Sequence, residues 1–329
     1  MTLIDDLGID VNFSSKIKIN SDKLNSLSSS LTELKQTQKG FDWINNDFWL
    51  PKTESKESVS QFFTLGNSIN FKYWSKNNSD LNYSSGKKGR IDARGAMYMW
   101  RCLKTCHDSQ TFDILDSKKL SKITFDEFKQ IFQDDSGNDV LPLLKERHQN
   151  WIDLAIKLNE FWDGKTINLI KYCKNSLIEF TKSMKKFRAF DDPICKMIMV
   201  NAIMHQGRGL VTFEQPILPG IDYQILKQLL RQGVIVTDTD IETKLENYEL
   251  LDSSDALDIR KAGLYVLFEV MKKTGISGDY VDNMIWGNRT KCEEENPVCM
   301  ISRETECPFH KFCDKKTELL IPLEETRFY

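Results

Sequence analysis

Four cysteines near the C-terminal end of the chain have the spacing of a metal site. They are Cys292, Cys299, Cys307 and Cys313, separated by six, seven and five residues. Thiolates are soft ligands, and four of them this close in sequence can bind one soft centre, either a [4Fe–4S] cluster or a zinc ion. The other four cysteines lie in apolar segments, where we expect small buried hydrophobic side chains. The spacing therefore predicts a metal-binding tail.

A carboxylate at Asp222 is the second group that can do chemistry. It ends the turn LPGID at residues 218–222 and precedes the amphipathic run YQILKQLL. An aspartate here can cap the helix that follows, and it can also stabilise a cationic transition state or orient a water molecule. The turn is similar to the helix-hairpin-helix signature LPGxG, whose N–H groups bind DNA phosphate. Asp222 replaces the second glycine of that signature and would repel a phosphate.

The composition indicates a folded, slightly acidic protein. The chain has 329 residues, 40% hydrophobic and 28% charged, with a formal net charge of −3 and a pI of about 5.9. This apolar content is enough for a core, and the charge argues against a general nucleic-acid coat. No run approaches the roughly 18 apolar residues of a membrane span, and MTLIDDLGID has no signal-peptide pattern. We expect a cytoplasmic monomer without a membrane partner.

Apolar residues recur with helical spacing along most of the chain, which predicts a mainly α fold. The segments expected to be helical are residues 93–106, 125–134, 139–162, 166–187, 192–206, 223–232 and 255–275. Residues 75–92 are rich in turn-forming residues and predict a loop, and only GLVTF (209–213) and GVIVT (233–237) have strand-like patterns. The expected divisions are a polar N-terminal segment (1–40), a helical core of two packed lobes (41–286) and the cysteine tail (287–329).

The cysteine tail resembles the iron–sulfur tail of endonuclease III-type DNA glycosylases. WGNRTKCEEENPVC and CPFHKFC carry the likeness, with Pro297 two positions before the second cysteine and Pro308 directly after the third. The middle spacer has seven residues here and two in that family. The resemblance implies a [4Fe–4S] cluster, with Zn²⁺ as the alternative. It also provides the alternative function, an iron–sulfur helix-hairpin-helix DNA glycosylase that excises a damaged base, with Asp238 or Asp240 as its catalytic carboxylate.

A second set of motifs resembles the queuosine salvage family along residues 41–329. The matching stretches are FFTLGNSINFKYW (62–74), PLLKERH within 122–151, DYQILKQLLRQGVI (222–235), LDIRKAGLYVLFEV (257–270), VDNMIW (281–286) and the final IPLEETRFY. Members of that family are N-glycosidases of queuosine 5′-phosphate, with a helical fold related to DNA glycosylases. Gln224, Asp258 and Gly220 stand where the family has arginine, glutamate and an aromatic residue.

This resemblance implies roles for individual side chains. Asp222 would stabilise or attack the oxocarbenium-like cation that forms as the glycosidic bond breaks. Asp282 would accept hydrogen bonds from the N1–H and 2-amino group of a guanine-like base. Lys196 would meet the 5′-phosphate or Asp222, and Arg260 would pair with a carboxylate or the phosphate. The aromatic candidates for stacking on the base are Phe71, Trp74, Tyr223 and Trp286. Each residue also has a structural interpretation, as a helix cap, a core ring or a snorkelling lysine.

The predicted function is a hydrolase of N-glycosyl bonds that releases queuine from queuosine 5′-phosphate or a related 7-deazaguanine nucleotide. Its partner is then a small-molecule nucleotide, and DNA is bound only under the alternative function. A third hypothesis is a non-catalytic helical module whose metal-stabilised tail binds RNA or protein, for which Asp222 would be dispensable. We expect the metal centre to be structural, because hydrolysis requires no electron transfer.

Overall fold

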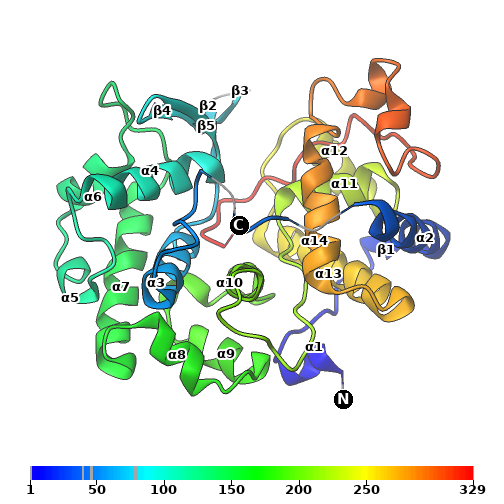
Figure 1. Cartoon of the computed structure of the whole chain (residues 1–329). Coiled ribbons are helices and arrows are strands. Elements are labelled where there is room, and N and C mark those ends of the chain that lie inside the picture. The colour runs from blue at the N-terminus through cyan, green and yellow to red at the C-terminus, as the bar shows by residue number, and fades with distance from the viewer. Residues whose placement is uncertain (1, 39–40, 45–46, 78–79, 329) are drawn as a thin grey trace. The chain divides into compact units, whose positions relative to one another are not determined.

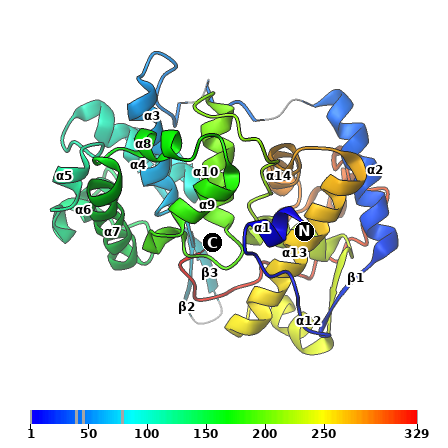
Figure 2. The ribbon, with the colours of Figure 1, turned by 90° about the horizontal axis from the view of Figure 1, so that it is seen from below.

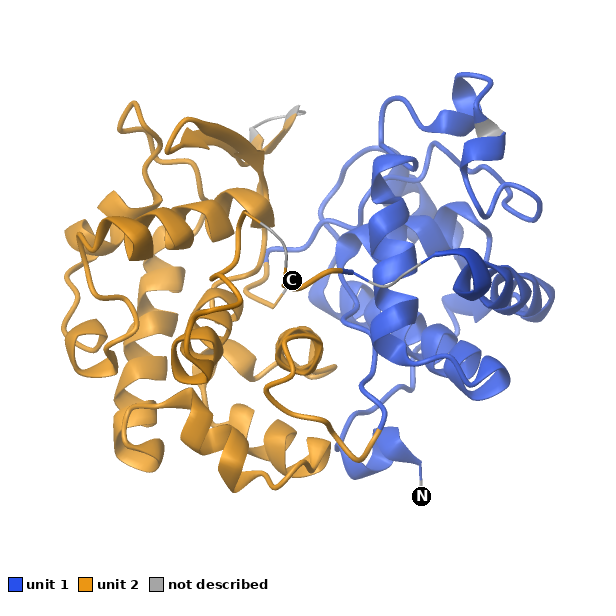
Figure 3. Cartoon of the chain, in the orientation of Figure 1, with its two compact units in different colours: residues 1–41, 216–325 blue, residues 42–215, 326–329 orange. Residues whose placement is uncertain are grey.

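The computed structural model describes residues 2–38, 41–44, 47–77 and 80–328 of the chain (Figure 1). The chain divides into two compact units, coloured separately in Figure 3. Unit 1 consists of residues 1–41 and 216–325, and unit 2 consists of residues 42–215 and 326–329. The N-terminal segment and the four cysteines of the tail, far apart in sequence, therefore belong to the same unit.

Unit 1 is built on the long helix α13 (Ser253–Thr274), which lies beside α2 (Ser21–Thr37) in Figures 1 and 2. Two further helices, α11 (Tyr223–Arg231) and α14 (Gly278–Gly287), pack against α13. Strand β1 (Ile17–Ile19) pairs antiparallel with β6 (Ile235–Thr237) and so ties the N-terminal segment to the later part of the unit. The smaller elements are α1 (Leu3–Asp6), α12 (Thr239–Glu246) and the 3-10 turns η2 (Asn288–Thr290), η3 (Val298–Met300) and η4 (Glu304–Glu306).

Unit 2 consists mainly of helices packed on α3 (Lys56–Asn67) and α7 (Leu144–Trp162). The elements in contact with α7 are α5 (Ser117–Leu120), α6 (Phe125–Phe132), α8 (Thr166–Tyr172) and the 3-10 turn η1 (Arg188–Phe190). The elements in contact with α3 are α4 (Ala96–Ser109), α8 and α10 (Lys196–Gly207). Helix α9 (Leu177–Met184), which lies between α8 and α10 in the sequence, contacts both of them. Buried aromatic rings, among them Phe62, Phe63, Phe128 and Trp151, fill the core.

The predicted mainly α class is confirmed, and the loop predicted for residues 75–92 is wrong. Two antiparallel hairpins occupy this segment, one of β2 (Trp74–Asn77) and β3 (Asp80–Tyr83), the other of β4 (Ser85–Lys88) and β5 (Ile91–Arg94). Gly89 and Arg90 have φ values of +56° and +67°, the conformation that a two-residue hairpin turn requires. Around Gly89 and Arg90 the turn-forming residues therefore marked a hairpin turn between strands too short to show an apolar alternation.

Two further local predictions can be compared with the structure. The helix expected over 166–187 is broken into α8 and α9, because Lys174 and Asn175 adopt positive φ values of 46° and 64°. GVIVT contributes strand β6 as predicted, whereas GLVTF forms no strand. No helix in the described part of the chain is both long and apolar enough to cross a membrane.

His205 is a buried titratable group in the core of unit 2. Its Nδ1 lies 2.6 Å from the Asn201 carbonyl oxygen and its Nε2 lies 3.3 Å from the Ser60 carbonyl oxygen. These two acceptors favour the protonated ring, but burial outweighs them and lowers the pKa of His205 from 6.5 to about 4. The folded chain therefore keeps this imidazole neutral at pH values where an exposed histidine is charged.

We expect the free energy of unfolding of unit 2 to fall by about 3 kcal/mol as the pH is lowered from 6.5 to 4. Between these values the unfolded histidine takes up a proton that the folded one does not, so the stabilisation is complete above pH 6.5 and is lost as the pH approaches 4. Urea unfolding at a series of pH values measures this loss. The variant His205→Gln should lack this part of the pH dependence, and an unchanged slope in the variant would contradict the assignment.

Candidate active site and cysteine cluster

Asp222 is the capping residue at the N-terminus of α11. Its Oδ1 accepts hydrogen bonds from the main-chain N–H groups of Gln224 at 3.0 Å and Ile225 at 2.9 Å. The residue is half-buried, and no donor in the described residues bonds to its Oδ2. One carboxylate oxygen is thus fixed by the helix, and the other accepts no hydrogen bond from the described residues.

The turn that carries Asp222 is held by α14. Gly278 lies so close to this turn that a Cβ atom added to it would be 2.1 Å from the Ile217 carbonyl oxygen. This distance is too short for any residue with a side chain, so the close packing requires glycine. One turn further along α14, Asp282 Oδ2 accepts a hydrogen bond of 2.7 Å from the Gly220 main-chain N–H. These contacts fix residues 216–222 and therefore the direction in which the Asp222 carboxylate points. Asp282 is consequently a neighbour of this turn, and its role in base recognition remains a prediction.

Arg289, which sequence reasoning missed, adds a positive charge to this region. Its guanidinium carbon lies 3.3 Å from the centroid of the Trp286 ring, and its Nη1 donates to the Trp286 carbonyl oxygen at 3.0 Å. Burial lowers the pKa of Arg289, and the nearby negative charge of Asp222 partly opposes this effect. Unit 1 therefore brings Asp222, Asp282 and Trp286 into one region. The three-residue spacing of Trp286 and Arg289 was the sequence signal for their contact.

The remaining candidates of unit 1 are more deeply placed or have structural partners. Tyr223 is 9% exposed, and Arg260 on α13 is 1% exposed. Of the two carboxylates in the DNA glycosylase alternative, Asp238 caps α12 through a main-chain hydrogen bond of 3.0 Å. Asp240 pairs with Lys244 at 3.3 Å. Both of these carboxylates therefore have a structural role on α12.

Three predicted site residues lie in unit 2. Phe71 and Trp74 are each 2% exposed, and Lys196, the first residue of α10, is 6% exposed. The Lys196 Nζ donates to the Asn70 carbonyl oxygen at 3.3 Å, so this lysine lies beside the segment that carries the two aromatic rings. The roles of Lys196 in phosphate binding and of Phe71, Trp74 and Tyr223 in base stacking remain predictions.

The motif PLLKERHQNW, which spans the start of α7, supports the same segment of unit 2. Arg147 donates to the Lys72 carbonyl oxygen at 2.8 Å, and its guanidinium carbon lies 4.3 Å from the Phe71 ring centroid. Asn150 donates to the Ser68 carbonyl oxygen at 2.9 Å. The motif thus fixes the backbone between α3 and β2, where Phe71 lies.

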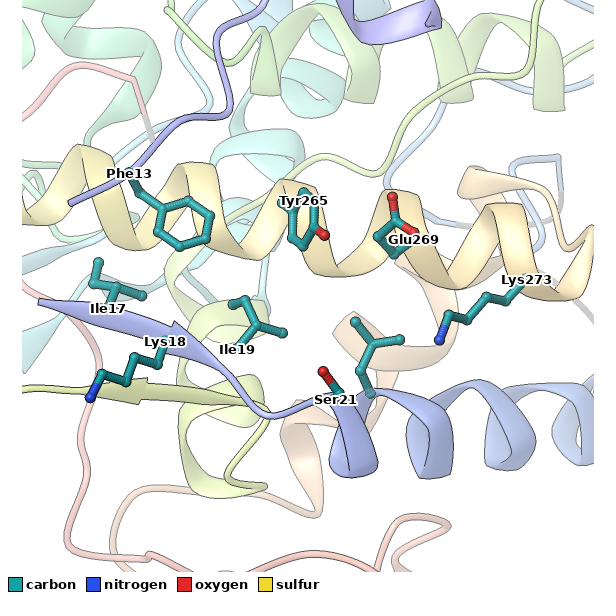
Figure 4. Close-up of a pocket in the computed structure, with 9 residues that line it drawn as sticks. Phe13, Ile17, Lys18, Ile19, Ser21, Tyr265, Glu269 and Lys273 are labelled. Atoms are coloured by element: carbon teal, nitrogen blue, oxygen red, sulfur yellow. The ribbon is translucent and has the colours of Figure 1, made fainter. Parts of the chain in front are cut away.

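A groove of about 600 Å³ lies in unit 1 on β1, the start of α2 and one face of α13 (Figure 4). Its lining includes Phe13, Ile19, Tyr265, Glu269 and Lys273, and the Phe13 and Tyr265 rings meet edge to face with centroids 6.1 Å apart. None of the predicted site residues lines this groove. It is therefore separate from the region around Asp222.

The four cysteines of the tail are half-buried in unit 1: Cys292 lies between η2 and η3, Cys299 lies in η3, and Cys307 and Cys313 follow η4. Burial raises the pKa of the Cys313 thiol to about 11, and the other three thiols are close enough to contribute to this rise. His310, a further possible ligand, has its Nδ1 2.8 Å from the Cys307 carbonyl oxygen. Among the residues that the structure describes, no three His, Cys, Asp or Glu side chains are arranged to hold a metal ion. The metal site remains a prediction.

The region around Asp222 contains a half-buried carboxylate fixed at one oxygen, with the Arg289 cation and the Trp286 ring nearby. Residues 49–201 match the family model described as queuosine salvage protein, and this match supports the resemblance to that family. The matched stretch lies in unit 2 and contains Phe71, Trp74 and Lys196, whereas Asp222 lies outside it.

Among solved structures, the chain is similar to an 8-oxoguanine DNA glycosylase from Pyrobaculum aerophilum in complex with 8-oxoguanosine. The two are 12% identical with a TM-score of 0.46, and the alignment covers 88% of this chain and 97% of the glycosylase. A comparison with curated proteins gave no match.

Proposed function

We propose that this chain is a hydrolase of the queuosine salvage family. It hydrolyses the base–ribose bond of queuosine 5′-phosphate, or of a related 7-deazaguanine nucleotide, and releases queuine. The observation that carries this proposal is the Asp222 carboxylate, whose Oδ1 is fixed by two main-chain N–H groups and whose Oδ2 accepts no hydrogen bond from the described residues. The family match over residues 49–201 supports the class of substrate. A helical fold related to DNA glycosylases and a monomeric, cytoplasmic state belong to the same proposal.

In the proposed reaction, Asp222 acts at the anomeric carbon of the ribose. Cleavage of an N-glycosidic bond builds positive charge on C1′, as in the hydrolysis of sugars. Asp222 Oδ2 stabilises this cation, or attacks it to form an intermediate that water then resolves. In either case the water oxygen ends on C1′ and one water proton ends on the departing base. Because the helix holds Oδ1, the carboxylate is already oriented before the charge develops.

Recognition of the base is proposed for α14. Asp282 accepts hydrogen bonds from the N1–H and the 2-amino group, a pair of donors that fits the two oxygens of a carboxylate. Its Oδ2 already accepts from Gly220, and a carboxylate oxygen has a further lone pair for the base. Trp286 lies four residues later on the same helix face. Arg289 occupies one face of the Trp286 ring, so the base stacks on the other.

Replacing Asp282 by asparagine separates base recognition from support of the turn. The amide oxygen of Asp282→Asn can still accept from Gly220, but its NH₂ group faces the donors of the base. We expect KM to rise about 10- to 100-fold while kcat and the melting temperature change little. Steady-state kinetics and thermal unfolding measure both effects. A lowered melting temperature with an unchanged KM would limit Asp282 to holding the turn.

The substrate panel that tests the function consists of queuosine 5′-phosphate, the nucleoside queuosine and duplex DNA containing 8-oxoguanine. Each is incubated with purified protein, and the free base is quantified by chromatography. We expect queuine from the nucleotide, less from the nucleoside and no base from the DNA. Base release from DNA alone, dependent on Asp238 or Asp240, would replace this function with the DNA glycosylase alternative.

A further inference from the structure

We propose that Arg289 binds the phosphate group of a nucleotide through its Nε–H and Nη2–H groups. That the ligand is a nucleotide rests on the proposed function, whereas the presence of an anion site does not. All of the residues involved belong to unit 1. Three observations carry the inference: the way in which the guanidinium is fixed, the two nitrogens that remain without a partner, and the negative charge of Asp222 nearby.

Trp286 fixes the guanidinium of Arg289. The guanidinium carbon lies 3.3 Å from the centroid of the Trp286 ring, so the cation is stacked on the face of the indole. Its Nη1 donates to the Trp286 carbonyl oxygen at 3.0 Å. Phe41 meets the same indole edge to face, with ring centroids 6.5 Å apart. The ring and the guanidinium therefore hold each other in place.

The other two nitrogens of this guanidinium have no partner among the described residues. Neither Nε nor Nη2 of Arg289 donates a hydrogen bond there, and no carboxylate of the described chain lies within ion-pair distance. Stacking uses the face of the guanidinium and leaves its in-plane N–H groups free. Nε–H and Nη2–H are parallel, and this fork matches two oxygens of a phosphate or a carboxylate. An anion-binding edge therefore remains on a side chain that is fixed and half-buried.

Two other arginines of unit 1 show the contrast with structural roles. Arg303 donates from the same fork, Nε and Nη2, to the two carboxylate oxygens of Glu306 at 2.5 and 2.7 Å. Arg231, the last residue of α11, is 1% exposed and donates to four main-chain carbonyl oxygens. Both arginines thus use their donors within the chain, as polar groups with a structural role do. Arg289 does not.

Asp222 and Arg289 are opposite charges that act on each other without contact. Burial lowers the pKa of Arg289, and the negative charge of Asp222 opposes this effect, although the two groups form no ion pair. Asp222 Oδ2 accepts no hydrogen bond from the described residues. A ligand that engages both groups therefore needs a positive or hydrogen-bond-donating part for Asp222 and an anionic part for Arg289.

A nucleotide has this distribution of charge. Positive charge builds on C1′ as the glycosidic bond breaks, and the phosphate lies at the other end of the ribose. At pH 7 a phosphate monoester carries a charge of about −1.5 to −2, whereas each phosphodiester of a nucleic acid carries about −1. The Arg289 fork therefore favours a free nucleotide over a nucleic acid, and over a nucleoside, which has no anionic group.

The first test compares the nucleotide with the nucleoside in the same variant of the full chain. We expect Arg289→Gln to lower the ratio of kcat/KM for queuosine 5′-phosphate to kcat/KM for queuosine by about 10- to 100-fold, the usual effect of losing hydrogen bonds to a charged group. The nucleoside is an internal control because it lacks only the phosphate. Arg303→Gln, in which Glu306 loses its partner, should keep the wild-type ratio. An unchanged ratio in Arg289→Gln would overturn the proposal.

Arg289→Lys separates the fork from the charge. Lysine keeps a cation but supplies a point charge in place of two parallel donors, so we expect a ratio between those of the wild-type chain and Arg289→Gln. If Arg289→Gln does not fold, the lysine variant decides. A wild-type ratio in Arg289→Lys would then overturn the proposal.

Binding of ribose 5-phosphate distinguishes failure of this proposal from failure of the proposed function. If neither queuosine substrate releases a base, calorimetric titration with ribose 5-phosphate still tests the anion site. A Kd that is about 10-fold or more higher for Arg289→Gln than for the wild-type chain supports the site. Equal Kd values, or no binding to either chain, would overturn it. Binding to duplex DNA that depends on Arg289, without binding of ribose 5-phosphate, would overturn the assignment to a free nucleotide.

Discussion

Replacing Asp222 by asparagine is expected to lower the rate of base release from queuosine 5′-phosphate by about 1,000-fold. The amide oxygen of asparagine can still accept the hydrogen bonds from Gln224 and Ile225, and asparagine is as good a helix cap as aspartate. The variant therefore keeps the fold and loses the negative charge that faces C1′. Single-turnover kinetics measure the rate, and circular dichroism with thermal unfolding verifies the fold.

Asp238→Asn is the matched control for this experiment. Asp238 caps α12 in the same unit through a main-chain hydrogen bond of 3.0 Å, so the substitution changes the same chemical group in an equivalent position. We expect the control to retain the wild-type rate. A folded Asp222→Asn variant with near-normal activity would contradict the role of Asp222 and would favour a non-catalytic module or another carboxylate.

Replacing Arg147 by methionine is expected to reduce the free energy of unfolding of unit 2 by about 3 to 5 kcal/mol. Arg147 is fully buried, and its guanidinium donates to the carbonyl oxygens of Ile69, Phe71, Lys72 and Pro142. Methionine fills a similar volume but leaves these acceptors buried without donors. Equilibrium unfolding in urea, monitored by tryptophan fluorescence, measures the loss.

Arg188→Met is the control for Arg147 in the same unit. Arg188 bonds to Glu146 and Asn150, but its side chain is 30% exposed, so water can replace the lost partners. We expect a loss of about 1 kcal/mol from this variant. Similar losses from the two arginines would show that the Arg147 contacts do not hold the segment between α3 and β2 in the way described.

The helical periodicity of the sequence was sufficient to predict the mainly α class, because most helices bury one apolar face. It was insufficient where single residues change the backbone direction. Lys174 and Asn175 interrupt the apolar pattern of α8 and α9 only through their positive φ values, which their residue types do not require. The two hairpins between residues 74 and 94 consist of strands of four residues each. Such short strands do not show the alternation of apolar and polar residues by which strands are recognised in a sequence.

The candidate site was predictable where one residue has both a local and a chemical role. Asp222 is recognisable as a helix cap from the sequence, and the structure adds that only one of its oxygens is engaged. Other interactions join residues more than 60 positions apart. Asp282 accepts a hydrogen bond from Gly220, and the negative charge of Asp222 acts on the Arg289 guanidinium. No short motif encodes such contacts, because they depend on how α11, α13 and α14 pack.

The packing of the cysteine tail shows the same limit. The spacing of the four cysteines predicts a metal ligand set, but Arg231 lies some 60 residues earlier and has no sequence feature that links it to them. Its burial and its contact with Cys292 emerge only when the tail packs against α11. Residues that hold a segment from a distance are therefore the ones that sequence reasoning misses.

The measurement that tests the central claim most directly is the product analysis of queuosine 5′-phosphate after incubation with the purified chain. Mass spectrometry should detect free queuine and ribose 5-phosphate in equal amounts, in proportion to the protein added, because hydrolysis of one N-glycosidic bond yields one of each. A nucleotide that remains intact in the presence of folded protein, or queuine that appears without ribose 5-phosphate, would contradict the proposed reaction.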